Sequence, residues 1–256
     1  MKKITFRVIL TAALAVFLGI GAYAGAGEKG HGHWSYEGEA GPNRWGELSP
    51  EFAVCSEGKN QSPVDIRGGA KGELKDLEFK YSDNPELDIE NNGHTIKVDY
   101  REGSKVVVNG AEYGLVQFHF HSPSEHTLDG KYYDMELHLV HKNKEGKLAV
   151  VGVFMKKGEA NAALDRILDN MPKKAGEKAD VKAAFNASTL LPADRSAYYT
   201  YPGSLTTPPC TEGVTWLVLK NPIQLSDKQL AAYRKIMDNT NRPLQPLNER
   251  RILMKN

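Results

Sequence analysis

Alternation of apolar and polar residues along the chain predicts that most of it forms β-strands. Half-buried strands alternate with a period of two, whereas buried central strands are continuously apolar. Runs that alternate or are rich in β-branched residues cover residues 77–82, 87–91, 95–100 and 105–109. More continuously apolar runs cover residues 148–155 and 214–219. We therefore expect a large sheet in which the last two runs are central strands.

Helical periodicity is confined to two segments. Residues 159–170 repeat apolar side chains at a helical spacing and end before Pro172. Residues 226–237 do the same and open with Ser226, a favourable N-cap. The predicted fold is mainly β (α+β): a single domain built on one large, twisted, mostly antiparallel sheet with a few short peripheral helices.

Two further strand-like runs carry histidines. His119 and His121 lie two apart in the first run, so their imidazoles point to the same face, roughly 7 Å apart along the strand. The second run, residues 132–141, follows a turn at Asp129 and Gly130 and can pair antiparallel with the first. This pairing would bring a third histidine beside the first two.

Face parity selects the third histidine. His138 shares a face with Glu136, a carboxylate that could fix the tautomer of a ligating imidazole, whereas His141 lies on the opposite face. On the first strand, Gln117 could serve His119 or His121 in the same way. Three histidines leave one position of a tetrahedral zinc open, as in catalytic sites. The alternative is a set of ordinary polar residues on a solvated sheet face.

The N-terminus is typical of a secretory signal peptide. A basic start precedes the apolar residues 8–20, and small residues allow cleavage after Ala24 or Ala26. A retained membrane anchor is the alternative, but the apolar run is short for a span of about 20 residues. We expect a signal peptide over residues 1–24, a flexible leader over 25–33 and one domain over 34–256.

Charge excludes some partners. The chain has 33 basic and 32 acidic residues, and the expected signal peptide holds three of the basic ones, which leaves 33 − 3 = 30 against 32. This near-neutral balance gives no reason to expect nucleic acid as a partner, or a membrane after signal cleavage. A periplasmic or secreted protein is predicted.

The two cysteines, Cys55 and Cys210, are expected to form a disulfide, because paired cysteines are usual in exported chains. A reactive thiol is the alternative. Cys210 directly follows the sequence SLTTPP, so a bridge to Cys55 would clamp that loop.

Seven motifs in a fixed order carry a family resemblance. They are NQSPVDI (60–66), NNGHTIKVDY (91–100), QFHFHSPSEH (117–126), MELHLVH (135–141), LAVVGVFMKKG (148–158), YPGSLTTPPCTEGVTWLVL (201–219) and NRPLQPLNER (241–250). From about Trp34 to the C-terminus, the chain resembles an α-class carbonic anhydrase of the exported bacterial type. The resemblance implies a conical cleft with zinc at its floor, bound by His119, His121 and His138. It also implies reversible hydration of carbon dioxide to bicarbonate and a proton, through attack by a zinc-bound hydroxide.

The resemblance also assigns roles within the cleft. Glu125 and Thr206 would orient the nucleophile, and His94 would shuttle protons along a water chain held by Tyr36 and Asn92. The substrate-binding residues would be Val140, Val150, Leu205, Thr206, Thr207, Val214 and Trp216. Sulfonamides and anions would inhibit by binding the metal.

Lys97 departs from the family pattern, which usually has a neutral amide there. A nearby ammonium would lower the pKa of His94 and could change inhibitor binding. Two other functions stay open on the same scaffold. One is a non-enzymatic zinc-binding or interaction protein, and the other is a zinc esterase, which we regard as a side activity because no additional nucleophile is evident.

Overall fold

The computed structural model describes residues 33–256. The expected signal peptide and most of the expected leader therefore lie outside the described residues. Within residues 33–256, no helix is long and apolar enough to cross a membrane.

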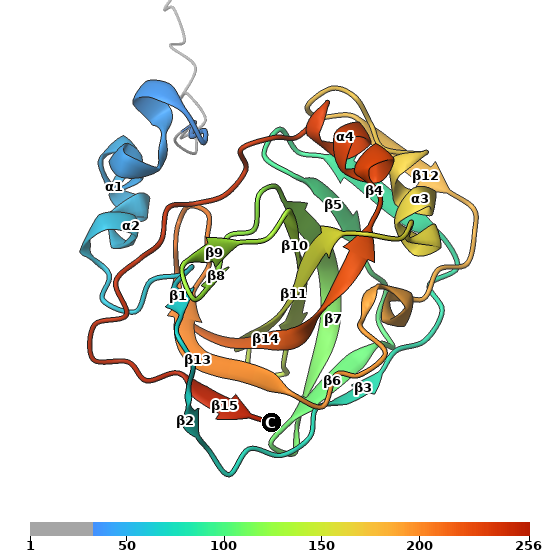
Figure 1. Cartoon of the computed structure of the whole chain (residues 1–256). Coiled ribbons are helices and arrows are strands. Elements are labelled where there is room, and N and C mark those ends of the chain that lie inside the picture. Colours follow the sequence, from blue (N-terminus) through green and yellow to red (C-terminus); the bar gives the residue numbers. More distant parts are fainter. Residues whose placement is uncertain (1–32) are drawn as a thin grey trace, which may run out of the picture. The chain divides into compact units, whose positions relative to one another are not determined.

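Fifteen strands and a few short helices make up the described part of the chain (Figure 1). The strands are β1 (Asp65–Ile66), β2 (Ala70–Lys71), β3 (Glu78–Lys80), β4 (Leu87–Asn91), β5 (Ile96–Asp99), β6 (Lys105–Val108), β7 (Ala111–His121), β8 (Thr127–Leu128), β9 (Lys131–Tyr132), β10 (Met135–Lys142), β11 (Leu148–Lys157), β12 (Lys178–Val181), β13 (Tyr198–Ser204), β14 (Glu212–Leu225) and β15 (Leu253–Lys255). The α-helices are α1 (Trp45–Leu48), α2 (Val54–Glu57), α3 (Ala162–Leu168) and α4 (Asp227–Arg234). The 3₁₀ helices are η1 (Gly38–Ala40), η2 (Pro42–Arg44), η3 (Pro50–Phe52) and η4 (Ala187–Leu190).

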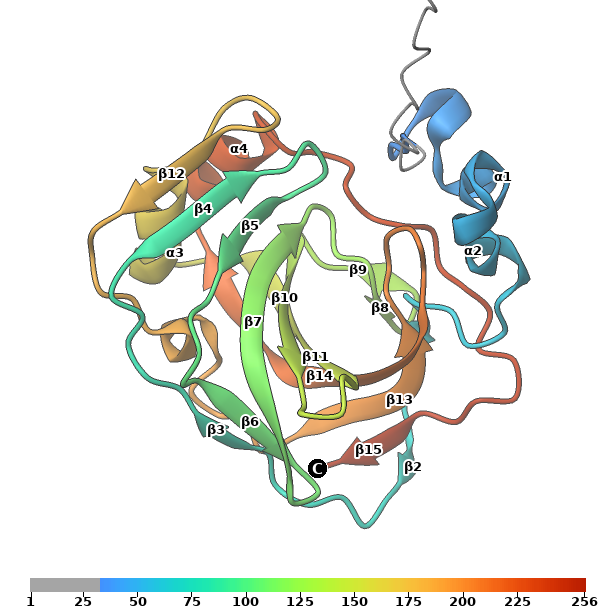
Figure 2. The same cartoon turned by 180° about the vertical axis from the view of Figure 1, so that it is seen from behind.

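One large twisted sheet organises this part of the chain, as predicted. Its main path runs β12-β4-β5-β7-β10-β11-β14-β13-β15-β2, with β6 and β3 paired beside β7. Neighbours are antiparallel except for β11 with β14 and β15 with β2, which are parallel. Strands β7, β10 and β11 therefore lie near the middle of the sheet, as the two cartoon views show (Figures 1 and 2).

The turn at Asp129 and Gly130 is present, but it does not join the two histidine strands directly. Both residues have positive φ (51° and 75°), and they connect β8 to β9. An Asp-Gly pair suits such a turn because glycine and aspartate tolerate this backbone conformation best. The short hairpin pairs with β1 in a separate three-stranded sheet. The second histidine strand consequently begins at Met135 rather than at residue 132.

The two predicted helices form with shorter bounds. Asn161 caps α3 by accepting hydrogen bonds from the backbone N–H groups of Ala163 and Leu164, so that helix begins after the expected residue 159. Ser226 is the N-cap of α4 as predicted, and Gln229 completes a capping box with it. The short helices α1 and α2 were not anticipated from the sequence.

Two hydrophobic clusters lie on the two sides of the central strands. Leu137 and Leu139 of β10 belong to the larger cluster. Val140, two residues from His138, packs instead against the smaller cluster. The smaller cluster contains Val150, Val214 and Trp216, with Val140 and Leu205 packed on it. The apolar residues that the sequence assigned to the substrate pocket are thus gathered in one place.

Cys55 on α2 and Cys210, which follows β13, form the predicted disulfide. The bridge closes a loop of 155 residues. Two backbone hydrogen bonds close the segment 205–211 around Cys210. The Cys210 N–H donates to the Thr207 carbonyl, 2.8 Å away, and the Leu205 N–H donates to the Thr211 carbonyl, 3.0 Å away. The bridge therefore anchors a compact turn that carries Thr206 and Thr207.

Reduction of this disulfide is expected to lower the stability of the protein. Closing so long a loop is worth up to about 5 kcal/mol in the chain-entropy model. The midpoint of thermal unfolding should fall when a reductant is added, whereas a Cys55→Ala/Cys210→Ala double variant should be insensitive to reductant. Thiol counting on the unfolded, unreduced protein should find no free thiol, and two free thiols would contradict the bridge.

Candidate metal centre and cleft

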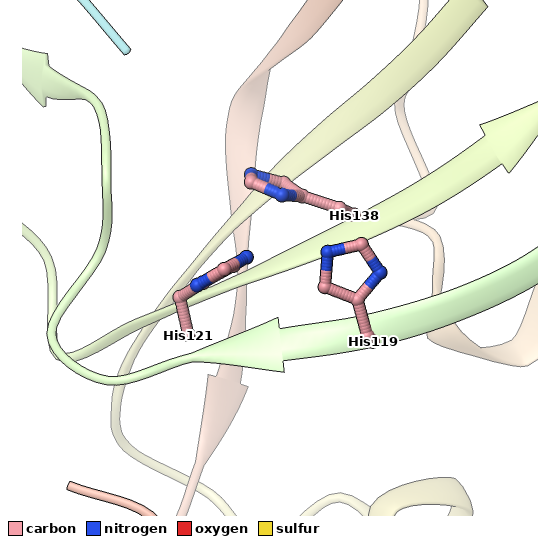
Figure 3. A group of neighbouring side chains, drawn as sticks. All are labelled: His119, His121 and His138. Carbon is pink, nitrogen blue, oxygen red and sulfur yellow. The ribbon is translucent and has the colours of Figure 1, made fainter. Parts of the chain in front are cut away.

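Three histidines converge at the centre of the sheet. His119 and His121 are carried by β7 and His138 by β10, where His138 lies directly opposite His119 in the antiparallel register. Their side chains point toward one another from the two strands (Figure 3). One nitrogen of each ring lies within 4.8 Å of the others, a spacing that could hold a metal ion.

Hydrogen bonds fix the tautomers of the two histidines on β7. Nδ1 of His119 donates to Oε1 of Gln117 at 2.8 Å, and Nδ1 of His121 donates to the carbonyl of Thr240 at 2.6 Å. A carbonyl oxygen can only accept, so each proton lies on Nδ1 and each Nε2 keeps its lone pair. Nε2 of His121 is buried and has no hydrogen-bond partner. The amide contact that the sequence suggested for Gln117 is present.

His138 offers the opposite nitrogen. Its Nε2 donates to Oε1 of Glu136 at 3.0 Å, which leaves the Nδ1 lone pair free. Oε1 of Glu136 also accepts from Nδ1 of His126 at 2.7 Å, and Oε2 accepts the backbone N–H groups of Glu125 and His126 at 2.9 Å each. Glu136 is thus fully satisfied by donors, and its orientation fixes that of His138.

Burial keeps all three candidate ligands neutral. It lowers the pKa of His119 well below its usual range, that of His121 to about 4, and that of His138 as well. Protonation of His119 is further disfavoured by the neighbouring imidazoles of His121 and His138. The positive charge of Lys97 also lowers the pKa of His119. Burial alone would raise the pKa of Glu136, but His126 and His138 hold it well below its usual range. Neutral imidazoles backed by an ionised carboxylate are what a metal cation requires.

Glu125 is a second buried carboxyl group beside the histidines. Its Oε2 lies 3.5 Å from Nε2 of His121, and its Oε1 accepts the Arg242 N–H at 2.9 Å. Burial raises the pKa of Glu125 to about 7, while His138, the Arg242 N–H and the Thr206 hydroxyl act in the opposite direction. Oε2 is buried without a hydrogen-bond partner. A buried acceptor of this kind favours a nearby hydroxyl donor, and Thr206 is 5% exposed in the adjoining loop.

A cleft of about 110 Å³ leads to the histidines. It is lined by Trp34, Tyr36, Asn92, His94, Thr95, Lys97, Gln117, His119, His121 and Thr207. The sequence assigned to this cleft the residues of the proton path, and the structure brings them together there. Tyr36 is half-buried, and its buried hydroxyl has no hydrogen-bond partner among the described residues.

His94 lies against an aromatic ring that the sequence did not single out. The Trp34 ring stacks on its imidazole, with centroids 3.7 Å apart and 10° between the planes. The backbone N–H of His94 donates to Oδ1 of Asn92 at 2.9 Å. Burial lowers the pKa of His94, and the neighbouring His33 lowers it further by a smaller amount.

The lowered pKa was expected for His94, but its cause differs from the one that the sequence suggested. Burial and His33, rather than Lys97, account for the shift. Nζ of Lys97 forms ion pairs with Glu90 and Asp99, each at 3.0 Å. Burial opposes the positive charge of Lys97, but these two carboxylates raise its pKa above the ordinary value.

Comparison with known proteins decides the family. The family model described as eukaryotic-type carbonic anhydrase matches residues 40–256. The chain belongs to the eukaryotic-type (alpha) carbonic anhydrases. Carbonic anhydrases of Klebsiella pneumoniae and Neisseria gonorrhoeae are each 45% identical to it, over 224 and 246 residues. These matches cover 86% and 95% of this chain, and 90% and 96% of the relatives.

Solved structures agree with the family assignment. An alpha carbonic anhydrase from Thermovibrio ammonificans, in complex with the inhibitor sulfanilamide, superposes with a TM-score of 0.84 at 47% identity. The match covers 88% of this chain and all of that one. The chain is accordingly a carbonic anhydrase enzyme.

Sequence reasoning missed a buried chain of hydrogen-bonded side chains behind the candidate metal centre of this carbonic anhydrase. Nε2 of His126 hydrogen-bonds to the Tyr201 hydroxyl at 2.6 Å, and that hydroxyl contacts Oγ of Ser62 at 2.9 Å. His126 joins this chain of side chains to Glu136. The sequence offered one signal for this chain of contacts, the histidine that follows Glu125. Its partner could not be predicted, because His126 and Tyr201 lie 75 residues apart and a single sequence does not show such pairs.

Proposed function

We propose that this carbonic anhydrase hydrates carbon dioxide reversibly to bicarbonate and a proton with one zinc ion bound by His119, His121 and His138. The observation that carries the proposal is the set of three neutral imidazoles with lone pairs free at Nε2, Nε2 and Nδ1. Three nitrogen ligands suit tetrahedral zinc and leave its fourth position open. A bound zinc ion would supply the Lewis acidity that makes water nucleophilic near neutral pH.

The chain's own residues would orient the reactants. The hydroxyl of Thr206 would donate to Oε2 of Glu125, which otherwise has no partner, and so would present its oxygen as an acceptor toward the cleft. Thr207 would contact bicarbonate. Carbon dioxide is small and apolar, and Val140, Val150, Leu205, Val214 and Trp216 would give it an apolar wall.

The fixed hydroxyl also accounts for the inhibitors that we expect. An ionised sulfonamide that binds the metal through nitrogen keeps one N–H, which Thr206 can accept. Inorganic anions would compete for the same metal position. Hydrolysis of activated esters is expected only as a side activity.

We further propose that the protein works in the periplasm or is secreted. Disulfides persist in oxidising compartments, and the Cys55–Cys210 bridge fits such a location.

A stopped-flow hydration assay tests the function directly. The protein as isolated should hydrate carbon dioxide, lose this activity with its metal on treatment with a chelator, and regain both when zinc is added. A protein that binds zinc through these histidines but hydrates nothing would instead indicate a non-enzymatic zinc-binding role.

Replacing His94 with alanine is expected to slow proton transfer without affecting the attack on carbon dioxide. The ratio kcat/KM reports binding and attack, whereas kcat includes proton release. We expect kcat to fall about 100-fold, the low end of the roughly 10²- to 10⁴-fold contribution of a positioned proton carrier, and kcat/KM to change less than about twofold. Stopped-flow assays at high substrate, with and without imidazole buffer, measure this, and imidazole should restore part of kcat.

His33→Ala is a matched control, because it removes a neighbouring imidazole outside the group of described residues that line the cleft. Since His33 lowers the pKa of His94, this variant should keep proton transfer and only raise the pH at which kcat changes. Equal losses of kcat and kcat/KM in His94→Ala, without imidazole rescue, would place His94 in the chemical step or in the fold.

A further inference from the structure

Among the described residues that line the cleft, Lys97 is the only one with a full charge. It lies on β5, directly opposite the candidate ligand His119 on β7 and opposite Glu90 on β4. Its side chain is 25% exposed. A permanent cation is therefore built into the wall beside the metal centre.

The two carboxylates that pair with Lys97 line a different cavity. Glu90 and Asp99 do not line the cleft; they line an adjacent groove of about 290 Å³ together with Asp88, Lys178 and Asp180. Lys97 thus separates an acidic groove from the cleft.

The ammonium also keeps a free donor. Lysine has three N–H groups, and the two ion pairs with Glu90 and Asp99 use two of them. The third has no protein acceptor among the described residues. An anion in the cleft can therefore approach a fixed positive charge that retains hydrogen-bonding capacity.

We propose that Lys97 is a specificity-determining residue that favours anions, bicarbonate and inorganic anions alike, over the neutral substrate in this cleft. This inference rests on the proposed function, because the anions are those that reach the metal centre. An ammonium several ångströms away attracts a monovalent anion, whereas carbon dioxide carries no net charge. Lys97 should therefore lower the bicarbonate KM and strengthen anion inhibition, and leave kcat/KM almost unchanged in both directions, because the equilibrium constant of the reaction fixes the ratio of the two kcat/KM values.

The Lys97→Gln variant tests this role. We expect the bicarbonate KM and the dissociation constant of thiocyanate to rise about three- to tenfold at low ionic strength, the size expected for one screened charge. Salt should shrink the difference, since the Debye length is about 10 Å at 0.1 M. The kcat/KM for carbon dioxide should stay within about twofold. Thiocyanate binding is followed by visible absorption of the cobalt-substituted protein, independently of activity.

Three variants serve as controls. Lys97→Arg keeps the charge and should retain anion affinity. Lys178→Gln removes the other lysine that contacts Glu90, at 3.7 Å, but does not line the cleft, so it should behave like the unaltered protein. In Lys97→Gln/Asp99→Asn the weakened anion binding should persist, because the cation itself is missing.

Unchanged thiocyanate affinity in Lys97→Gln would overturn the proposal. So would an equal effect in Lys178→Gln, or full recovery in the double variant, which would assign the effect to repulsion by Asp99. If the unaltered cobalt protein gives no response to thiocyanate, the metal site itself is misassigned and the proposed function fails. A normal response in the unaltered protein with no effect of Lys97 would overturn the inference alone.

Discussion

Replacing His138 with alanine should abolish most metal binding and, with it, hydration of carbon dioxide. The change removes one of three converging nitrogens and leaves Glu136 without one of its donors. Loss of a partner in the second layer of a metal site typically costs about 10- to 100-fold in affinity, and loss of a ligand should cost at least about 100-fold. Elemental analysis of the purified variant should find well under one zinc per chain, and stopped-flow assays should find activity near background.

His141→Ala is the matched control. His141 is a buried histidine three residues further along β10, but it lies on the opposite face, where its Nε2 contacts the Tyr81 hydroxyl at 2.6 Å. This variant should lose stability and keep its zinc. Full zinc retention in His138→Ala, together with zinc loss in His141→Ala, would overturn the assignment.

Replacing Thr206 with alanine should weaken catalysis and sulfonamide binding together. Without the hydroxyl, the buried Oε2 of Glu125 would have no donor, and the proposed orientation of the nucleophile and the proposed acceptor for the sulfonamide N–H would be lost. Removing one such oriented polar group typically costs about 10²- to 10³-fold in rate. We expect kcat/KM to fall about 100-fold, with weaker binding of sulfanilamide in a competition assay.

Thr207→Ala, in the same turn, removes a hydroxyl at the cleft without touching Glu125. Its effect on kcat/KM should be much smaller, within about tenfold. Thr206→Ala with unchanged activity and unchanged inhibition would remove Thr206 from its orienting role. A Thr206→Ser variant should recover most of the activity if the hydroxyl is what matters.

The strands were predictable because their side chains alternate. The period of two placed His119, His121 and His138 on one face and His141 on the other, and the structure has them so. The sequence could not show that the Asp129–Gly130 turn belongs to a separate hairpin. Pairing of β8 with β1 depends on a contact between Thr127 and Asp65, 62 residues apart, and local patterns carry no information on such contacts.

The site was predictable to the extent that its chemistry is local. Histidines and a carboxylate two residues apart on one strand identify a metal site and its support. The partners that fix the other ligands come from distant segments. Thr240, which fixes His121, lies 119 residues away, and it contributes only a backbone carbonyl, which no residue type would reveal.

The stacking of Trp34 on His94 limits how this protein can be handled. The indole lies nine or seven residues after the end that cleavage after Ala24 or Ala26 would create, and it stacks on the imidazole expected to carry protons. An affinity tag or surface tether joined just ahead of Trp34 would disturb the stacking contact between Trp34 and the imidazole. Attachment next to β15, which is paired in the sheet with β13, avoids that segment. Protein immobilised ahead of Trp34 should therefore show a lower proton-limited kcat than protein immobilised next to β15, while both remain folded.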